Sequence, residues 1–348
     1  MHHFVSERVF PRQLVYGVAM TNSLIDSFGR RISYVRLSVT DRCDLRCQYC
    51  MAETMRFLPK EDILSFEETV TLADLLISRG VNRIRLTGGE PLVRRDIVYL
   101  VEQLGAKIGH GLDELTMTTN ATQLARFALA LAAAGIRRIN VSLDSLDPDR
   151  FRAITRRGDL DQVLAGIRAA RTAGIAIKIN MVALKGLNDD EIEAMARWCA
   201  SEGHGLTLIE TMPLGEVAEQ RTTHYLPLDA VLRDLAERFE LIPSMVRTGG
   251  PARYYDLPQI GLRLGVITPL TNNFCAGCNR IRIAATGTVY GCLGHDQKVE
   301  LRELLRTGGS QAVNGALDVL LAGKPQRHEF DIAAPRPAVA RHMSVTGG

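Results

Sequence analysis

The 348-residue sequence has no long apolar run and no excess of charge of one sign. Its longest apolar stretch, 127–136, is about half of the roughly 20 residues that a membrane helix needs, and the N-terminus lacks a signal-peptide pattern. The 42 basic and 39 acidic residues nearly cancel, which does not favour a dedicated nucleic-acid binder. No low-complexity tract or long charge run is present. We therefore expect a cytoplasmic protein that binds neither membrane nor nucleic acid.

Cysteine is also scarce, but six of the seven cysteines fall into two triplets. An odd number of clustered cysteines argues against a secreted disulfide framework. Cys199, beside Trp198 in a helical pattern, is interpreted as a small buried hydrophobic residue. A structural zinc ion needs four ligands, whereas a [4Fe-4S] cluster held by three thiolates keeps one iron free. The sequence therefore predicts two clusters that take part in chemistry, held by Cys43, Cys47 and Cys50 and by Cys275, Cys278 and Cys292.

Short β-rich runs alternate with amphipathic helical stretches between residues 34 and 212, which is typical of βα units with a parallel sheet. Strands are predicted at 34–39, 83–86, 115–118, 138–143, 175–182 and 206–209, and helices at 66–78, 121–134, 160–173 and 190–201. Gly80, Gly135 and Gly174 follow helices, where left-handed caps are expected. Six units predict an α/β fold, a partial (β/α)6 TIM-like barrel, with an open sheet as the alternative.

The rhythm breaks near Pro213, and a further helix is predicted at 225–239, before a segment rich in glycine, proline and short β runs. We expect a smaller C-terminal region that covers the open side of the barrel. The predicted divisions are an N-terminal extension (1–30), the barrel core (31–215), the C-terminal region (216–330) and a tail (331–348). Residues 333–348 are predicted to be extended and poorly packed.

The first triplet lies in TDRCDLRCQYC, directly after the first predicted strand. Three thiolates on so short a loop hold three irons of one cluster and leave the fourth iron for the amino and carboxylate groups of a small molecule. The alternative is a zinc loop completed by a distant histidine. The next strand ends in Gly88, Gly89, Glu90 and Pro91, where glycines allow a ligand to approach the backbone; taken alone, this segment is also an ordinary turn.

Polar residues recur where the later strands end: Thr118, Thr119 and Asn120; Ser142 and Asp144; Lys178 and Asn180; Glu210 and Met212. Ligands of parallel α/β folds bind at the carboxyl ends of the strands, so we expect these side chains to line one cavity. Taken singly, each has an ordinary structural alternative, such as a helix cap or core filling.

The second triplet lies in and after FCAGCNRIRI, and zinc there would need His295 as its fourth ligand. On a strand, Arg280 and Arg282 point to the same side, where two guanidiniums suit a phosphorylated ligand. Arg36, Arg85 and Lys178 occupy strand positions that are normally apolar. Because a buried cation is costly without a partner, we expect them to face a cavity that holds an anion; the alternative is that they reach solvent or pair with carboxylates.

The cysteine loop and RLTGGEP resemble the motifs of the radical S-adenosylmethionine (SAM) superfamily. Together with TTN, VSLDSLD, KINMV, FCAGCNRIRI and the terminal Gly347-Gly348, they resemble the GTP 3',8-cyclase family, which catalyses the first step of molybdenum cofactor biosynthesis. The resemblance implies two [4Fe-4S] clusters and SAM as cofactors, with SAM contacts at Tyr49, Gly89, Ser142 and Met212. It implies GTP contacts at Arg36, Arg85, Thr118, Lys178, Arg280, Ile281 and Arg282.

The resemblance also implies a reaction. A 5'-deoxyadenosyl radical takes the 3' hydrogen of GTP, and the product is (8S)-3',8-cyclo-7,8-dihydroguanosine 5'-triphosphate, which a partner enzyme, cyclic pyranopterin monophosphate synthase, then uses. The diglycine tail suits a close backbone approach to the active site. The alternatives are another radical SAM enzyme with an auxiliary cluster, of the peptide maturase type, and a zinc-stabilised nucleic-acid-binding module. The electron donor, the acid or base, and the choice between monomer and homodimer stay open.

Overall fold

The computed structural model describes residues 23–215 and 222–347, so most of the predicted N-terminal extension and Gly348 lie outside the described residues. All six predicted strands are present: β1 (Tyr34–Ser38), β2 (Arg83–Thr87), β3 (Glu114–Thr119), β4 (Arg138–Ser142), β5 (Ala176–Val182) and β6 (Gly205–Ile209). They lie side by side in chain order and are parallel. In the described part of the chain the sheet ends at β12 on one side and β7 on the other without closing. The partial barrel is therefore confirmed.

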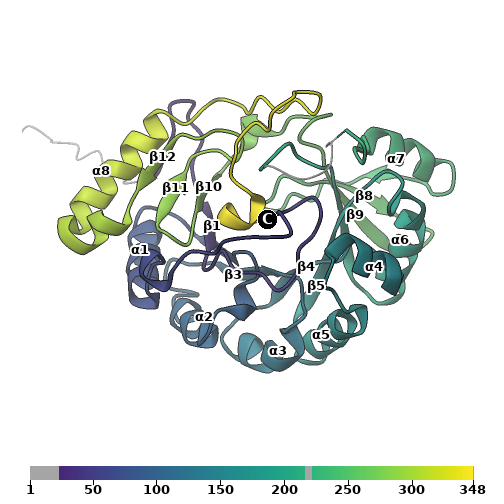
Figure 1. Cartoon of the computed structure of the whole chain (residues 1–348), viewed down its shortest axis with the longest axis horizontal. Helices are drawn as coiled ribbons and strands as arrows, with labels where there is room; N and C mark the ends of the chain where they lie inside the picture. Colours follow the sequence, from purple (N-terminus) through teal and green to yellow (C-terminus); the bar gives the residue numbers. More distant parts are fainter. Residues whose placement is uncertain (1–22, 216–221, 348) are drawn as a thin grey trace, which may run out of the picture.

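Helices follow these strands round the outside of the sheet (Figure 1). They are α1 (Phe66–Ser78), α2 (Ile97–Gly105), α3 (Leu124–Ala133), α4 (Pro148–Thr155), α5 (Leu160–Thr172) and α6 (Ile192–Ser201). Gly80, Gly135 and Gly174 have φ angles of 89°, 96° and 80°, which confirms the left-handed caps. The sequence missed α2 because its run of apolar residues resembles a buried strand as closely as a short helix.

The C-terminal third adds strands to both edges of the barrel sheet. On one edge β9 (Leu262–Ile267) pairs parallel with β6, followed by β8 (Arg253–Leu257) and β7 (Ile242–Pro243). On the other edge β10 (Arg280–Ile283) pairs parallel with β1, followed by β11 (Thr288–Tyr290) and β12 (Lys298–Glu300). This region therefore borders the open side of the barrel from two directions.

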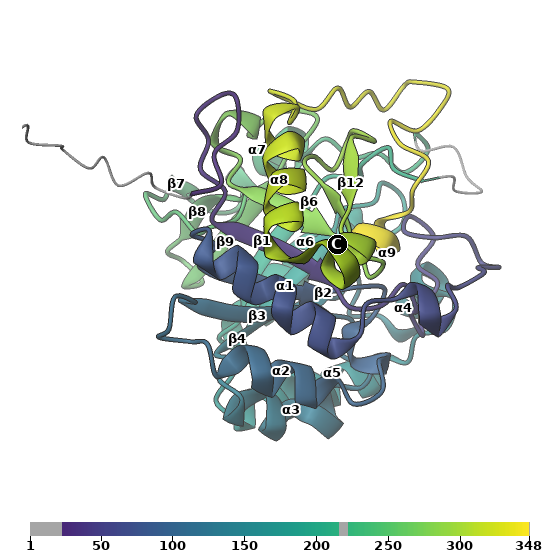
Figure 2. The same ribbon diagram turned by 90° about the vertical axis from the view of Figure 1, so that its left-hand side faces the viewer.

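Three helices belong to this region: α7 (Leu228–Ala236), α8 (Gly309–Ala322) and α9 (Met343–Thr346). Helix α8 stands beside α1 (Figure 2), and Arg79 at the end of α1 forms a 2.6 Å ion pair with Asp318. Short single-turn segments complete the fold: η1 (Lys60–Asp62), η2 (Pro91–Val93), η3 (Asp189–Glu191), η4 (Cys275–Gly277) and η5 (Leu304–Gly308). No helix among the described residues has both the length and the apolarity that a bilayer crossing requires.

Side-chain alternation along the strands separates a hydrophobic core from a polar interior. On β1, Val35 and Leu37 are buried in the core between sheet and helices, and Arg36 lies between them on the opposite face. Strand β2 repeats the pattern, with Arg85 flanked by the buried Ile84 and Leu86. The apolar residues thus hold the helices, and the charged residues are left inside the barrel.

The prediction of a poorly packed tail is wrong from Val339 onward. Val339 is buried and forms a parallel bridge with Leu214, and Gly215 N donates to Val339 O at 2.9 Å. The side chains of Ser344 and Thr346 in α9 are also buried, and α9 packs against β1 in the middle of the molecule (Figure 1). The sequence did not reveal this packing because Ala338 and Val339 form backbone hydrogen bonds with Pro213 and Gly215, which are distant in the chain.

Candidate active site

Both cysteine triplets line a single cavity inside the barrel: the first triplet follows the carboxyl end of β1, and Cys275 and Cys278 precede the amino end of β10, which is parallel to β1. Nearly all of the predicted site residues line it as well: Tyr49, Gly89, Ser142 and Met212; Arg36, Arg85, Thr118, Lys178, Arg280 and Arg282. The exception is Ile281, whose side chain is fully buried in the hydrophobic core on the opposite face of β10. Strand alternation explains this difference, because Arg280 and Arg282 flank Ile281 and point the other way.

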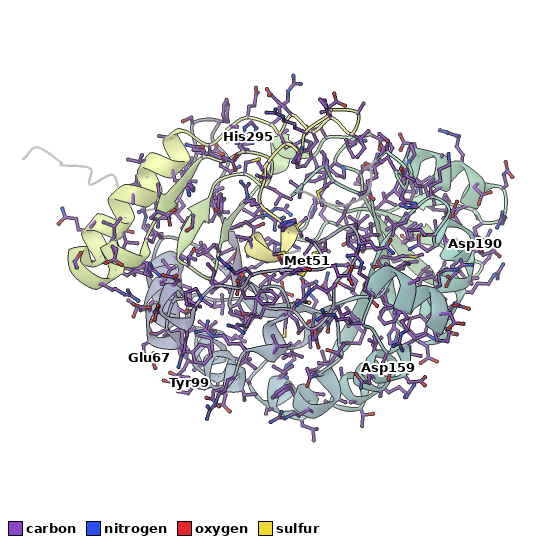
Figure 3. All side chains as sticks on the ribbon, viewed as in Figure 1. Met51, Glu67, Tyr99, Asp159, Asp190 and His295 are labelled. Carbon is purple, nitrogen blue, oxygen red and sulfur yellow. The ribbon has the colours of Figure 1, made fainter. Side chains whose placement is uncertain are left out.

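The loop that carries the first triplet is held by its own backbone and by α4. Cys50 N donates to Cys47 O at 3.0 Å, and Arg46 N donates to Thr155 O at 3.0 Å. The Arg46 guanidinium also binds Cys43 O at 2.6 Å. The three cysteines therefore reach the cavity from one short segment. Met51, which follows the triplet directly, marks this segment near the middle of the view in Figure 3.

Burial raises the pKa of each thiol in the first triplet, for Cys50 to about 11. Iron supplies the positive charge that stabilises a buried thiolate. The three cysteines are therefore better suited to bind an iron cluster than to remain free thiols. No group of three or more His, Cys, Asp or Glu side chains within 23–215 and 222–347 is arranged to hold a single metal ion. A cubane assigns each cysteine to a different iron, and its ligands therefore stand farther apart than those of one ion.

Two buried carboxylates support the first triplet. Glu90 accepts hydrogen bonds from Thr119 Oγ1 (2.7 Å), Asn120 N (2.6 Å) and Leu92 N (2.9 Å), and burial raises its pKa to about 7. Asp144 accepts a 2.7 Å hydrogen bond from Tyr49 OH, and burial raises the pKa of Asp144 to about 6. These contacts fix the Tyr49 ring and the end of β2 on either side of the cysteine loop.

The two glycines of the GGE segment are required by the cysteine loop itself. A Cβ on Gly89 would lie 2.4 Å from Arg42 O, and one on Gly88 would lie 2.5 Å from Thr40 O. Gly89 N donates to Thr40 O at 2.8 Å, and Glu90 N donates to Arg42 O at 2.8 Å. The end of β2 therefore lies directly against the segment that precedes the triplet.

The second triplet lies across the cavity, and basic side chains from other elements contact it. Arg30 donates to Cys275 O at 2.9 Å, Lys324 Nζ lies 3.5 Å from Cys278 Sγ, and Arg341 donates to Cys292 O at 3.2 Å. His295, the fourth ligand that a zinc site would need, is not part of the cavity lining. Its Nε2 lies 3.1 Å from Arg327 O, and Figure 3 places it at the upper edge of the view. The zinc alternative therefore lacks its fourth ligand.

The wall between the triplets is cationic. Arg36, Arg85, Arg280, Arg282 and Lys178 all line the cavity, and the Nε atoms of the first three are buried without a hydrogen-bond partner among the described residues. Burial lowers the pKa of Arg85 to about 10 and also lowers that of Arg36 and Lys178. Arg85 and Arg282 are buried and the other three cations are partly buried; such a cluster favours an anionic ligand, because an unpaired charge is costly in a medium of low dielectric constant.

The tail reaches the same cavity. Arg282 Nη1 donates to Gly347 O at 2.5 Å, and Met343 and Ser344 are part of the cavity lining. Gly347 has φ of 74°, and a Cβ there would lie 1.9 Å from Thr87 Oγ1, so only glycine fits. The close backbone approach expected for the tail is present at Gly347.

Sequence reasoning missed the basic residues that contact the second triplet from outside it, namely Arg30, Lys324 and Arg341. Each comes from a segment without a motif, and the residues meet only after folding, so the sequence carried no signal for them. It also missed Tyr254, whose hydroxyl accepts a 2.7 Å hydrogen bond from Lys178 Nζ. Its place on β8, beside β9 at one edge of the sheet, was not predicted.

Comparison with known proteins agrees with this geometry. Residues 37–199 match the model of the Radical SAM superfamily, and residues 204–330 match Molybdenum Cofactor Synthesis C. The fold is similar to Streptococcus suis SuiB bound to S-adenosylmethionine, with a TM-score of 0.59 over 90% of this chain and 77% of that chain, at 15% identity. The fold and the first triplet thus define a radical SAM protein, a class that uses a [4Fe-4S] cluster and SAM.

Two curated relatives extend over almost the whole chain. A GTP 3',8-cyclase of Erythrobacter litoralis is 57% identical over 329 residues, which are 94% of this chain and 99% of the relative. A GTP 3',8-cyclase of Rhizobium etli is 56% identical over 333 residues, 95% of this chain and 96% of the relative. The chain belongs to the GTP 3',8-cyclase family.

Proposed function

We propose that the chain converts GTP to (8S)-3',8-cyclo-7,8-dihydroguanosine 5'-triphosphate, the first step of molybdenum cofactor biosynthesis, with SAM at the first triplet and GTP at the second. The observation that carries this proposal is the shared cavity, which has one cysteine triplet on each side and is lined by five cationic side chains, two of them buried. The family membership supports the same reaction.

At the first triplet, Cys43, Cys47 and Cys50 hold the [4Fe-4S] cluster in this proposal. Tyr49 contacts the adenine, and its ring is fixed by the hydrogen bond to Asp144. Gly89, Ser142 and Met212 line the same cavity, and we assign them as further SAM contacts. When bound, the cluster and SAM supply one electron and a 5'-deoxyadenosyl radical; the protein's task is to orient the reactants and exclude water.

At the second triplet, Cys275, Cys278 and Cys292 would hold a second [4Fe-4S] cluster, which would supply a binding site for the guanine of GTP. Arg36, Arg85, Lys178 and the arginines of β10 bind the phosphates, and Thr118 accepts a 3.4 Å hydrogen bond from Arg85. Ile281 contributes through its backbone position between Arg280 and Arg282, since its side chain is in the core. Guanidinium groups suit this role because they bind phosphate oxygens in pairs.

The product triphosphate would pass to cyclic pyranopterin monophosphate synthase, the downstream partner in this proposal. The tail segment from Val339 to Gly347 contributes Met343 and Ser344 to the cavity lining and is anchored by Arg282. Its place there suits a role in shielding the radical from water while the substrates are bound.

Anaerobic reconstitution followed by incubation of the reduced protein with SAM and GTP tests the proposal. We expect about eight irons per chain and formation of 5'-deoxyadenosine that depends on GTP. Equal formation of deoxyadenosine without GTP would remove the support for a cyclase. A colourless zinc protein with salt-sensitive nucleic-acid binding would instead indicate the binding module.

A further inference from the structure

Lys324 is a buried lysine whose ammonium group points at a cysteine of the second triplet. The residue is only 3% exposed, and Nζ lies 3.5 Å from Cys278 Sγ. Among the described residues, the lysines that form ion pairs with carboxylates are Lys107 and Lys298, and Lys324 is not among them. A buried ammonium ion requires a compensating negative charge, and the nearest candidate is the sulfur of Cys278.

The position of Lys324 is built into the fold. It follows the C-terminal end of α8, and its backbone N–H donates to Leu321 O at 3.2 Å. Its aliphatic stem packs beside Gly291, next to Cys292: a Cβ built on Gly291 would lie 3.4 Å from Lys324 Cγ, an ordinary van der Waals distance.

Arg30 ties the Lys324 segment to the same triplet. Its guanidinium donates to Pro325 O and Gln326 O, each at 2.7 Å, and to Cys275 O at 2.9 Å. Arg30 is itself held by a 2.6 Å ion pair with the buried Asp26. The Arg30 side chain thus links the backbone after Lys324 to Cys275, the first cysteine of the triplet. This link holds the Lys324 segment in place beside the triplet.

The two triplets differ in the charged group that lies near a sulfur atom. Lys324 Nζ lies 3.5 Å from Cys278 Sγ, whereas Asp44 Oδ1 lies 3.9 Å from Cys43 Sγ.

We propose that Lys324 is a positioning residue of the second cluster, and that its ammonium group raises the reduction potential of that cluster. The inference rests on the proposed function, since it requires a [4Fe-4S] cluster on Cys275, Cys278 and Cys292. Such a cluster with three thiolates carries net negative charge, and reduction by one electron increases that charge. A cation in a buried site stabilises the reduced form more than the oxidised form, because solvent screens the interaction poorly there.

The test uses the full-length chain with Cys43, Cys47 and Cys50 changed to Ala, so that the second triplet is the source of any cluster signal. After anaerobic reconstitution, iron is counted and the cluster is titrated with dithionite while its paramagnetic resonance is recorded. Lys324→Met and Lys324→Arg are compared on this background. Lys298→Met is the matched control, because its side chain is 52% exposed and pairs with Glu300.

For Lys324→Met we expect the ratio of reduced to oxidised cluster at a fixed potential to fall about tenfold, a shift of about 59 mV to more negative potential. Lys324→Arg keeps the charge and should stay near the parent, as should Lys298→Met. Loss of iron in Lys324→Met with iron kept in Lys324→Arg would also support the proposal, because the charge is then needed to hold the cluster.

The outcomes that contradict the inference differ from those that contradict the proposed function. If the background variant binds no iron, the second cluster itself is absent, and both proposals fail. If Lys324→Met keeps its iron and titrates at the parent potential, the role of Lys324 is wrong and the proposed function stands. If Lys324→Met and Lys324→Arg lose iron to the same extent, the lysine acts through its shape, and the argument from its charge is overturned.

Discussion

The two cysteine triplets face the same cavity, and arginines contact the backbone of both, but the charged group near a sulfur atom is Asp44 at the first triplet and Lys324 at the second. Buried carboxylates, Glu90 and Asp144, stand behind the first triplet, and burial raises the pKa of its thiols. Basic side chains contact the second triplet, and they lower the pKa of Cys278. Equal numbers of cysteines therefore do not make equivalent sites, because the charge around a cluster changes its reduction potential and its ligand preference.

This difference matches the two proposed tasks. A site that gives an electron to SAM benefits from neighbours that disfavour the reduced cluster, and acidic side chains have this effect. A site that receives a nucleotide triphosphate benefits from cations, which Arg280 and Arg282 supply on the strand next to the triplet. The charge pattern is therefore consistent with the separate roles that we propose for the two triplets.

The largest expected effect separates the triplets directly. Changing Cys43, Cys47 and Cys50 to Ala should abolish SAM cleavage and leave about four irons per chain on the second triplet. Changing Cys275, Cys278 and Cys292 to Ala should also leave about four irons, but with SAM binding retained. Iron analysis and equilibrium dialysis with labelled SAM measure the two outcomes.

The matched pair of triple variants is its own control. Loss of all iron in either variant would show that the triplets do not hold independent clusters. Retention of SAM binding after loss of the first triplet would contradict its assignment as the SAM site.

The second prediction concerns the tail, which approaches both triplets. Gly347→Ala should displace the tail, because a Cβ would lie 1.9 Å from Thr87 Oγ1 and φ is 74°. The Arg282 contact to Gly347 O would then be lost. We expect cyclisation to fall by about tenfold or more, equivalent to at least about 1.4 kcal/mol of barrier, with iron content unchanged, as measured by deoxyadenosine and product formation.

Gly315→Ala is the control for this substitution. Gly315 lies on α8, and an added Cβ would meet no atom within 4 Å. The change should therefore preserve activity and stabilise the helix slightly. Equal activity in Gly347→Ala and Gly315→Ala would show that the position of the tail has no effect on the reaction.

The sequence predicted the barrel strands and the cysteine triplets well, because both are local signals. Strand periodicity and cysteine spacing are present in the chain before folding, and β1 to β6 differ from their predicted bounds by a residue or so. The cation wall was also predicted, since Arg36 and Arg85 interrupt apolar strands. The contacts of Lys324 and Arg341 were not predictable in this way, because they depend on how distant segments meet.

The tail is a second case in which contacts between distant segments could not be predicted from the sequence. Residues 333–348 have little periodicity, so the sequence predicted poor packing. In the structure Ala338 N donates to Pro213 O at 2.9 Å, and Val345 N donates to His342 O at 3.2 Å. Order there comes from pairing with the loop after β6, which local propensity does not report.

The third prediction tests the cationic side of the comparison. Arg280→Ala should weaken GTP binding by about 10-fold to 100-fold, since a charge-assisted hydrogen bond contributes about 1.5–3 kcal/mol. Iron content should be unchanged because Arg280 is not a cluster ligand. Calorimetric titration of the reconstituted protein with GTP measures the affinity. Arg263→Ala is the control, because Arg263 lies on β9 at the surface and pairs with Asp256 at 2.7 Å; loss of iron in Arg280→Ala would contradict the assigned role.

The smallest expected effect is a change in the pH dependence of the free energy of unfolding, and it tests Glu90, a buried acidic residue beside the first triplet. Burial raises the pKa of Glu90 to about 7, above the ordinary value near 4.5. Between these values the folded apoprotein keeps a proton that the unfolded chain has lost, so the free energy of unfolding falls as pH rises, by up to about 1.4 kcal/mol per pH unit. Above pH 7 both states are ionised, and this contribution to the slope disappears.

Glu90→Gln should flatten the slope, because it removes the titrating carboxyl group, and it should lower stability where that group is neutral, because its amide nitrogen cannot accept a hydrogen bond as the second carboxyl oxygen does. Asp144 has the same sign of shift, with a pKa of about 6, so the window that isolates Glu90 lies between pH 6 and 7. Urea unfolding of the apoprotein measures the difference, with Glu102→Gln on the surface of α2 as the control. An unchanged slope in Glu90→Gln would show that the Glu90 carboxyl group is already ionised in the folded protein between pH 6 and 7. The negative charge beside the first triplet would then be larger than the raised pKa of Glu90 implies.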